Sequence, residues 1–180
     1  MFPPPRRPSF RWLALVGLRG LLLGLLGLAA VRATLLTSYR VAGSSMRETL
    51  QDGDRILVCE AGWLLAPAVG DTVVAEVEDE VLVKRVVAGP GDSIGMWHGR
   101  VLRNGLAVAE SIPPELDCGD SFPAVRLGAD EYFLLGDHRR VSVDSREFGP
   151  VRASQLLGRV LLRIHGGDVS QVAALERRGS

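Results

Sequence analysis

The chain has 180 residues, of which 47% are hydrophobic, and its 21 basic and 21 acidic side chains give no net charge. This composition indicates a folded protein of one domain and excludes a chain that is disordered throughout. Its two cysteines are too few for a disulfide framework, and no C-x-x-C or H-E-x-x-H sequence predicts a metal site.

The neutral total hides two asymmetries. Residues 1–40 contain six arginines and no acidic residue, so residues 41–180 carry a net charge of −6, which argues against a nucleic-acid partner. Of the 21 basic residues, Lys84 is the single lysine. Arginine keeps its proton in proteins, so Lys84 is the one side-chain amine that can become a base. The alternative is that the single lysine only reflects a general preference of this sequence for arginine over lysine.

The N-terminal segment predicts a membrane anchor. Residues 12–31 read WLALVGLRGLLLGLLGLAAV, about the 20 apolar residues that a helix needs to cross a bilayer. The one charge inside this run, Arg19, lies near enough to one end to reach the headgroups. The arginines before the run predict a cytoplasmic N-terminus, with everything after about residue 37 outside the plasma membrane. A cleaved secretory signal and a buried core helix are the alternatives.

These features predict four parts. They are a short cytoplasmic tail, a transmembrane anchor, an extracytoplasmic β-rich domain and a C-terminal tail, at residues 1–11, 12–36, 37–168 and 169–180. Within the domain, residues 95–130 are expected to form a smaller inserted lobe.

After residue 40 the sequence is typical of a mostly β fold. Short β-branched runs alternate with turn residues, and no long 3.6-residue apolar period is present, which predicts antiparallel sheets in a barrel-like domain. The expected strands are Arg55–Cys59, Thr72–Val77, Val81–Val87, Glu131–Leu135 and Leu156–Ile164. Asn104-Gly105 predicts a hairpin within residues 100–108. Short helices are expected at residues 45–50 and 169–178, and an irregular excursion at residues 110–125.

Residues 43–50, GSSMRETL, form the first segment that can carry chemistry. A serine beside a glycine at the entry to a short helix can present its hydroxyl with backbone N–H groups nearby, which suits a nucleophile with an oxyanion hole. The alternative is that Ser44 or Ser45 caps the helix, with Glu48 completing a capping box. Taken alone, the residues favour the cap.

Residues 81–87, VLVKRVV, form the second segment. In an extended strand Lys84 shares one face with Leu82 and Val86, so both neighbours on its own side are apolar. Desolvation on such a face lowers a lysine pKa, and a base must fall from about 10.4 toward neutrality to work there. The alternative is a lysine that reaches solvent at a sheet edge.

The third segment, residues 133–151, is dense in hydrogen-bonding side chains directly after an apolar strand. Ser142, Asp144 and Arg146 alternate, so in an extended chain the acid and the arginine can pair while the serine reaches a neighbouring amine. The alternative is an ordinary solvated loop whose ion pair contributes little.

Together the three segments resemble the type I signal peptidases, which are membrane-anchored serine/lysine proteases. The family pattern G-x-S-M-x-P-T-L is similar to residues 43–50, and K-R-V-x-G-x-P-G-D is similar to residues 84–92. The third pattern, G-D-N-x-x-x-S-x-D-S-R-x-F/W-G-x-V, is similar to residues 136–151. The three stand in the family's order behind the predicted anchor, and the resemblance covers roughly residues 10–165.

The resemblance implies a role for each matched residue. Ser45 is the expected nucleophile, with its backbone N–H holding the oxyanion, and Lys84 is the expected general base. Ser142 is expected to orient the Lys84 amine, within a supporting set completed by Asp137, Asp144, Ser145 and Arg146. Substrate is expected to lie as an extended strand against the sheet. Its small residues, first and third before the cut, are expected in pockets lined by Val41, Ala42, Met46, Leu50 and Val83.

The function implied is the removal of N-terminal signal peptides from exported preproteins, at cleavage sites of the A-x-A type. The expected partners are these preproteins, membrane lipid and the secretion translocon. Neither a cofactor nor a metal is expected, and no nucleic acid.

Two residues depart from the family pattern, because Glu48 stands where the family has proline and His138 where it has asparagine. They motivate an alternative of a different class, a catalytically inactive membrane-tethered binding protein. A soluble autoprotease that regulates transcription, and a triad of Ser45 with His138 and Asp137, are further alternatives. Whether Cys59 and Cys118 form a disulfide stays open.

Overall fold

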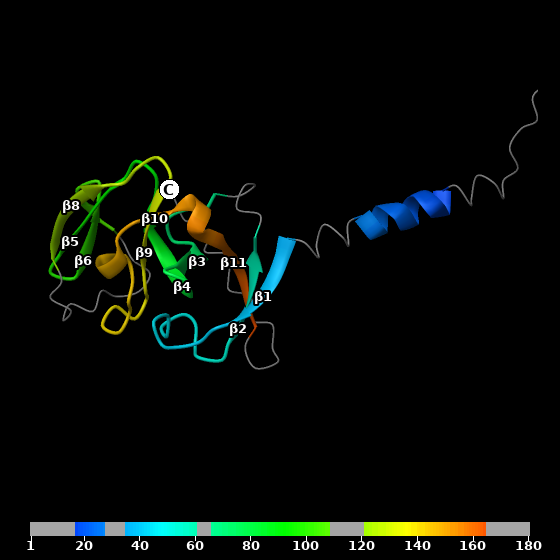
Figure 1. Ribbon diagram of the computed structural model, residues 1–180, viewed down its shortest axis with the longest axis horizontal. Coiled ribbons are helices and arrows are strands. Elements are labelled where there is room, and N and C mark those ends of the chain that lie inside the picture. The colour runs from blue at the N-terminus through cyan, green and yellow to red at the C-terminus, as the bar shows by residue number, and fades with distance from the viewer. Residues whose placement is uncertain (1–16, 28–34, 61–65, 109–120, 165–180) are drawn as a thin grey trace, which may run out of the picture. The chain divides into compact units, whose positions relative to one another are not determined.

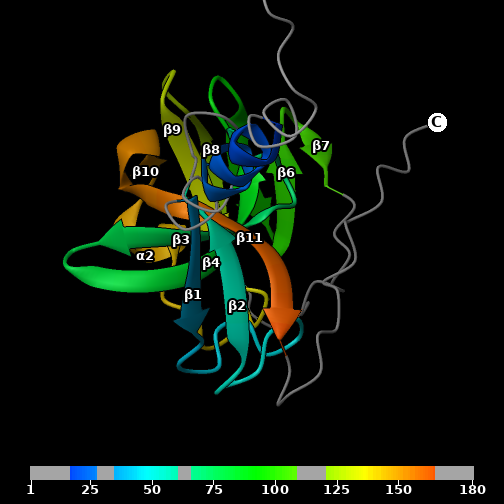
Figure 2. The same ribbon diagram turned by 90° about the vertical axis from the view of Figure 1, so that its right-hand side faces the viewer.

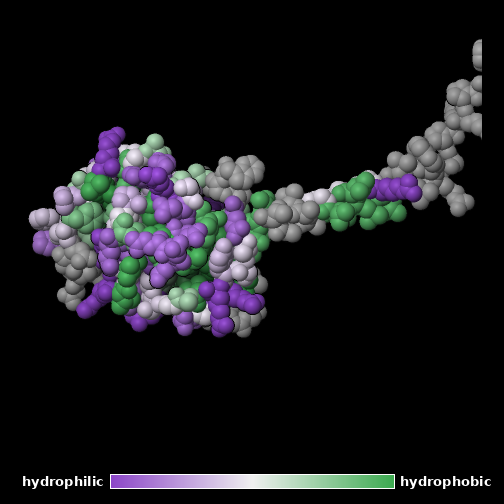
Figure 3. Space-filling view, in the orientation of Figure 1, coloured by the Kyte–Doolittle hydropathy of each residue, from purple (hydrophilic) through white to green (hydrophobic). Residues whose placement is uncertain are grey.

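The computed structural model describes residues 17–27, 35–60, 66–108 and 121–164. It divides into two units, Met1–Leu36 and Thr37–Ser180. In the first unit residues 17–27 are helical (Figure 1), and Figure 3 shows a mostly hydrophobic surface there. Among the described residues, no helix is both long enough and apolar enough to cross a bilayer. The predicted anchor, residues 12–36, includes residues on both sides of this helix that lie outside the described part.

The second unit is built on a seven-stranded sheet (Figure 1). Figure 2 shows β1, β2 and β11 side by side at one end of it. The neighbours from β2 to β10 pair antiparallel, which confirms the predicted mostly β class. In spatial order the strands are β1 (Leu36–Arg40), β2 (Arg55–Cys59), β11 (Leu156–Ile164), β3 (Thr72–Val77), β4 (Glu80–Ala88), β9 (Glu131–Leu135) and β10 (Val151–Arg152).

A second, four-stranded sheet has the order β7-β6-β5-β8. Its strands are β7 (Leu106–Ala107), β6 (Arg100–Arg103), β5 (Ser93–Trp97) and β8 (Phe122–Arg126). The predicted hairpin is confirmed, because Asn104 and Gly105 connect β6 to β7 with φ of 54° and 78°, the left-handed conformation that this turn requires. The expected lobe, residues 95–130, falls on this segment, of which residues 109–120 lie outside the described part.

Four of the predicted strands match β2, β3, β9 and β11 residue for residue, and the fifth lies within β4. Four strands were not predicted, namely β1, β5, β8 and the two-residue β10. β8 corrects the end of the expected irregular excursion, because Phe122–Arg126 pairs with β5. Its sequence FPAVR contains a proline and no alternation of apolar and polar residues, so it carries no strand signal. The helix expected at residues 169–178 lies outside the described residues.

The buried side chains form three clusters that the two sheets and their connections share. Tyr132 and Leu134 of β9 lie with Val73 and Val86 in one cluster, while Phe133 and Leu135 lie with Ile94 and Met96 in another. β9 therefore buries both of its faces, as a central strand does, and carries the chain directly into the third segment at residue 136.

Candidate functional site

The nucleophile candidate, Ser45, lies in a compact turn and not in the helix expected at residues 45–50. The Arg47 N–H donates to the Ser44 carbonyl over 3.1 Å, and the Leu50 N–H donates to the Met46 carbonyl over 2.6 Å, but no regular helix follows. The helix prediction was wrong because this polar segment is held by other elements, described below, and not by its own backbone ladder. Met46 and Leu50 are buried beneath the turn, whereas Ser45 itself is half-buried.

Lys84 lies on β4, an interior strand between β3 and β9, with 3% of its surface exposed. The alternative of a lysine reaching solvent at a sheet edge is therefore excluded. Burial lowers the pKa of Lys84 below its ordinary value of 10.5; the Asp144 carboxylate opposes this shift, and the Arg146 guanidinium adds to it. No hydrogen bond joins Lys84 to another described residue through its side chain. Burial thus shifts the amine toward the neutral form that a lysine base requires.

Asp144 makes several hydrogen bonds and an ion pair that hold the third segment in place. It is fully buried and caps the short helix α2 (Ser145–Phe148) by accepting the Arg146 N–H over 3.2 Å. It also accepts the Gly136 N–H over 3.0 Å and pairs with the Arg146 guanidinium over 2.8 Å. The predicted Asp144–Arg146 pair is confirmed. The extended conformation assumed for these residues was wrong, because Asp144 stops the extended chain and begins a helix.

Ser142 and Ser145 both lie inside the third segment. The Ser145 hydroxyl accepts the Leu134 N–H over 2.9 Å and so ties α2 to β9. The Ser142 hydroxyl is buried and has no hydrogen-bond partner among the described residues. A side chain added at Gly136 would overlap Ser142 and would meet the Ser45 carbonyl oxygen at 2.7 Å. The first and third segments therefore touch at Gly136, beside a buried hydroxyl that has bonding capacity to spare.

Asp137 joins all three segments. It accepts two hydrogen bonds from the Arg85 guanidinium, over 2.7 Å and 2.6 Å, and one from the Thr49 hydroxyl over 2.5 Å. The Asp137 N–H also points at the Met46 sulfur over 3.4 Å. Arg85 and Thr49 were given no role in the sequence analysis. The available signal was their position, since each lies within a matched segment.

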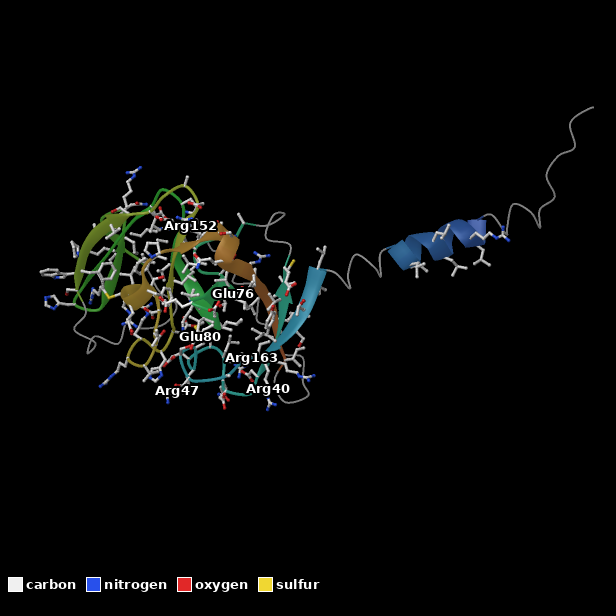
Figure 4. The ribbon with its side chains drawn as sticks, viewed as in Figure 1. Arg40, Arg47, Glu76, Glu80, Arg152 and Arg163 are labelled. Atoms are coloured by element: carbon white, nitrogen blue, oxygen red, sulfur yellow. The ribbon has the colours of Figure 1, made fainter. Side chains whose placement is uncertain are left out.

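A second arginine, Arg163, holds the same turn from β11. Its guanidinium donates to the Thr49 carbonyl over 2.8 Å and pairs with the buried Asp54 over 2.7 Å. Figure 4 draws Arg47 and Arg163, which come from the turn and from the end of β11. Sequence reasoning missed Arg163 and Asp54, and no local pattern indicates them, because their contact joins residues more than 100 positions apart.

Both departures from the family pattern can be placed. His138 is 7% exposed, and its ring contacts the Ser44 carbonyl oxygen and the Arg47 guanidinium. Glu48 is exposed on the turn. No contact of His138 and Asp137 with the Ser45 hydroxyl is formed, so the triad alternative gains no support among the described residues.

The pocket candidates fall into two groups. Val41, Met46 and Leu50 lie in one buried cluster, and Val83 packs against it, half-buried. Ala42 is exposed and is not part of that cluster. The remaining members were not anticipated; they are Ile56, Val58 and Val74, with Tyr39, Leu157 and Val160 packed against them.

β4 offers an open edge beside this cluster. It pairs with β3 over Glu80–Arg85, but with β9 only at Arg85, Val86 and Ala88. Val86 exchanges its backbone hydrogen bonds with residues 70 and 71 on the β3 side. Because bonding alternates along an antiparallel strand, the backbone groups of Val81 and Val83 face the opposite side, where no described strand pairs with them.

The described residues hold no group of three or more histidine, cysteine, aspartate or glutamate side chains arranged to bind a metal ion.

Residues 11–165 match the model of the family described as signal peptidase, peptidase S26. Signal peptidase I of Bacillus amyloliquefaciens is 35% identical over 64% of this chain and 68% of its own length. The probable signal peptidase I-2 of Synechocystis is 31% identical over 74% of this chain and 65% of its own. This chain thus spans about two thirds of the length of these relatives.

One solved structure is also similar. The crystal structure of a signal peptidase I from Enterococcus faecalis V583 aligns with a TM-score of 0.47 at 21% identity, covering 53% of this chain and 97% of that chain.

Proposed function

The chain belongs to the signal peptidase family, peptidase S26, and from that membership we propose that it removes N-terminal signal peptides from exported preproteins by means of Ser45 and Lys84. It is a serine endopeptidase, a hydrolase, by that kinship. One observation carries the assignment of the base: the chain's single lysine is buried on an interior strand with a lowered pKa.

In the proposed reaction the neutral Lys84 amine takes the proton of the Ser45 hydroxyl as its oxygen attacks the scissile carbonyl carbon. The Ser45 N–H stabilises the oxyanion of the tetrahedral intermediate. The Lys84 ammonium then gives its proton to the leaving amine, which departs as the mature protein. Lys84 next takes a proton from a water molecule, which attacks the acyl carbon. The bond to the Ser45 oxygen then breaks as the Lys84 ammonium returns the proton to that oxygen, and the signal peptide is released.

Ser142 is proposed to orient the amine. Its buried hydroxyl has no other partner among the described residues, so a hydrogen bond with the Lys84 amine would satisfy it. Asp144 and Arg146 support the loop that carries Ser142, because the Arg146 guanidinium also donates to the Ser142 carbonyl over 3.2 Å. Asp137 and Ser145 fasten this loop to Arg85 and to β9.

The open side of β4 supports an extended substrate. A peptide strand can pair with the free backbone groups of Val81 and Val83, as in β-augmentation. Its small side chains would then point toward the cluster that contains Met46 and Leu50. Val41 and Val83 remain candidates for the pocket walls, whereas the exposure of Ala42 leaves it only a rim position.

The place of action is proposed from residues 1–36. A single-pass anchor at residues 12–36, with the arginine-rich tail in the cytoplasm, would hold the catalytic domain on the outer face of the plasma membrane. There it would meet membrane lipid, the signal peptides held in it and the translocon that delivers them.

The test is direct. The purified full chain in detergent is incubated with a preprotein whose signal ends in A-x-A, and the cut is mapped by mass. Cleavage after the second alanine is expected, with none in Ser45→Ala. A lactam-type inhibitor should add its mass to Ser45. Absence of both cleavage and acylation in the folded protein would instead support the inactive binding protein.

A further inference from the structure

His138 touches the peptide group that joins Ser44 to Ser45. Its ring nitrogen Nδ1 lies 3.3 Å from the Ser44 carbonyl oxygen, and its other ring nitrogen, Nε2, lies 3.2 Å from an Arg47 guanidinium nitrogen. Its backbone N–H donates to the next carbonyl, that of Ser45, over 2.9 Å. His138 therefore contacts the carbonyls on both sides of the candidate nucleophile.

These partners fix the protonation of the ring. A guanidinium has donors only, so Nε2 must accept from Arg47, and the proton of the neutral imidazole then sits on Nδ1. Nδ1 in turn donates to the Ser44 carbonyl, which can only accept. Arg47, His138 and the Ser44 carbonyl thus form one chain of hydrogen bonds that runs in a single direction.

We propose that His138 is a positioning residue that orients the oxyanion donor, an inference that rests on the proposed role of Ser45. The Ser44 carbonyl and the Ser45 N–H belong to the same planar trans peptide, so a bond that fixes the carbonyl also fixes the direction of the N–H. Among the described residues the Ser45 N–H has no acceptor of its own. The donor stays free for an oxyanion, while both neighbouring carbonyls are held.

The chain of hydrogen bonds also strengthens the donor. A carbonyl that accepts a hydrogen bond polarises its own peptide group, and linked bonds reinforce one another in a site of low dielectric constant. The stronger donor stabilises the negative charge that develops on the oxyanion in the transition state. The contribution of His138 therefore belongs in kcat and not in substrate affinity.

Two substitutions separate this role from a merely structural one. The side-chain amide of asparagine places its nitrogen where Nδ1 lies, whereas that of glutamine reaches the position of Nε2. His138→Asn should therefore keep the bond to the Ser44 carbonyl and retain kcat. His138→Gln and His138→Ala lose this bond. Since removal of an oxyanion donor costs roughly 10²- to 10³-fold and here the donor is only released, kcat should fall about tenfold, with KM unchanged.

The measurement is kcat and KM for preprotein cleavage by the full chain. The enzyme concentration is taken as the amount of Ser45 that a lactam inhibitor has acylated at completion, so that unfolded protein does not contribute. The initial acylation rate should fall with kcat. His98→Asn is the matched control, since His98 is an exposed histidine of the second sheet with φ of 46°, which asparagine tolerates.

Wild-type kcat in His138→Ala, a rise in KM alone, or equal losses in the asparagine and glutamine variants would each overturn the positioning role. Failure of the proposed function looks different: the wild type itself would show neither cleavage nor acylation, or cleavage would persist in Ser45→Ala, whatever stands at position 138.

Discussion

Lys84 occupies a place where its charged form is costly. The strand buries its amine, and Asp144, the carboxylate that most favours the charged form, is already paired with Arg146 over 2.8 Å. The carboxylate therefore offsets only part of the desolvation. An arginine here would keep its charge at any accessible pH, so it could not serve as the base that we propose for this position.

The lowered pKa predicts the pH profile of cleavage. Only the neutral amine can act as a base, so kcat/KM should rise about tenfold per pH unit and level off below the ordinary lysine value of 10.5. The measurement is log kcat/KM against pH for one peptide substrate. A plateau reached only at or above 10.5 would show that burial does not tune this amine.

Lys84→Met should lose activity and gain stability. Activity should fall by roughly 10²- to 10⁴-fold, the usual contribution of a general base. At a pH below the lowered pKa the wild-type protein buries a charge, so removing it should raise the free energy of unfolding there by about 1 kcal/mol.

The sign of this effect changes with pH in a defined way. Between the lowered pKa and 10.5 the unfolded chain binds more protons than the folded one, so wild-type stability rises with pH across that window. The advantage of Lys84→Met should shrink there. Urea unfolding at several pH values measures it, and a difference independent of pH would contradict the assignment.

At the scale of elements, the turn that carries Ser45 is held by its neighbours. Arg85 of β4, Asp137 of the third segment and Arg163 of β11 all reach Thr49, through its hydroxyl or its carbonyl. The conformation of the turn therefore depends on residues far from it in sequence.

Asp137→Ala should destabilise the fold by about 3 kcal/mol, since it leaves the largely buried Arg85 without its carboxylate. Arg103→Ala is the control, because its 3.9 Å pair with Asp92 is solvent-exposed and such a pair is worth about 0–1 kcal/mol. Urea midpoints give both values. Equal losses would mean that the Asp137 pair is no more than a surface contact.

Gly136→Ala should affect kcat more strongly than the free energy of unfolding. The new methyl group would overlap Ser142 and press on the Ser45 carbonyl oxygen, so kcat should fall by about tenfold or more, as misplacement near the chemistry does. At Gly89 an added methyl group meets only Tyr132, at 3.7 Å, so Gly89→Ala should keep wild-type kcat. Normal turnover by Gly136→Ala would contradict the close approach of the two segments.

The sequence predicts the elements whose signal is local. Thr72–Val77 is rich in β-branched residues and Leu156–Ile164 is an apolar run, so both strands can be read from the sequence. β8 is a strand only because β5 lies beside it, and residues 45–50 fail to form a helix because distant arginines hold them. Packing against neighbouring strands and long-range ion pairs determine the conformation of such segments, and no local sequence pattern contains either of them.

The contacts of the candidate site also fall into those that the local sequence predicts and those that only the fold brings about. Asp144 and Arg146, two positions apart, could be paired from the sequence. The Arg163–Asp54 contact and the orphan Ser142 hydroxyl could not, because they depend on how β11 and α2 dock. His138 was recognised as a departure from a pattern, but its contact with the Ser44 carbonyl needed the structure.

At the scale of the whole molecule, the basic residues 1–40 and the acidic residues 41–180 predict a chain whose two ends lie on opposite sides of the plasma membrane. The full chain should stay in the membrane pellet after carbonate extraction. Protease added outside intact cells should remove the domain and leave an N-terminal tag protected. Recovery of the full chain in the soluble fraction would refute the anchor, and loss of the tag with the domain would refute the orientation.

The most direct test of the Ser45–Lys84 mechanism is preprotein cleavage by Lys84→Arg, measured beside the wild type at equal amounts of folded protein. Arginine keeps the positive charge and removes only the titratable amine. We expect no cleavage above the level of Ser45→Ala, at any pH at which the wild type works. Near-normal turnover by Lys84→Arg would contradict a lysine base.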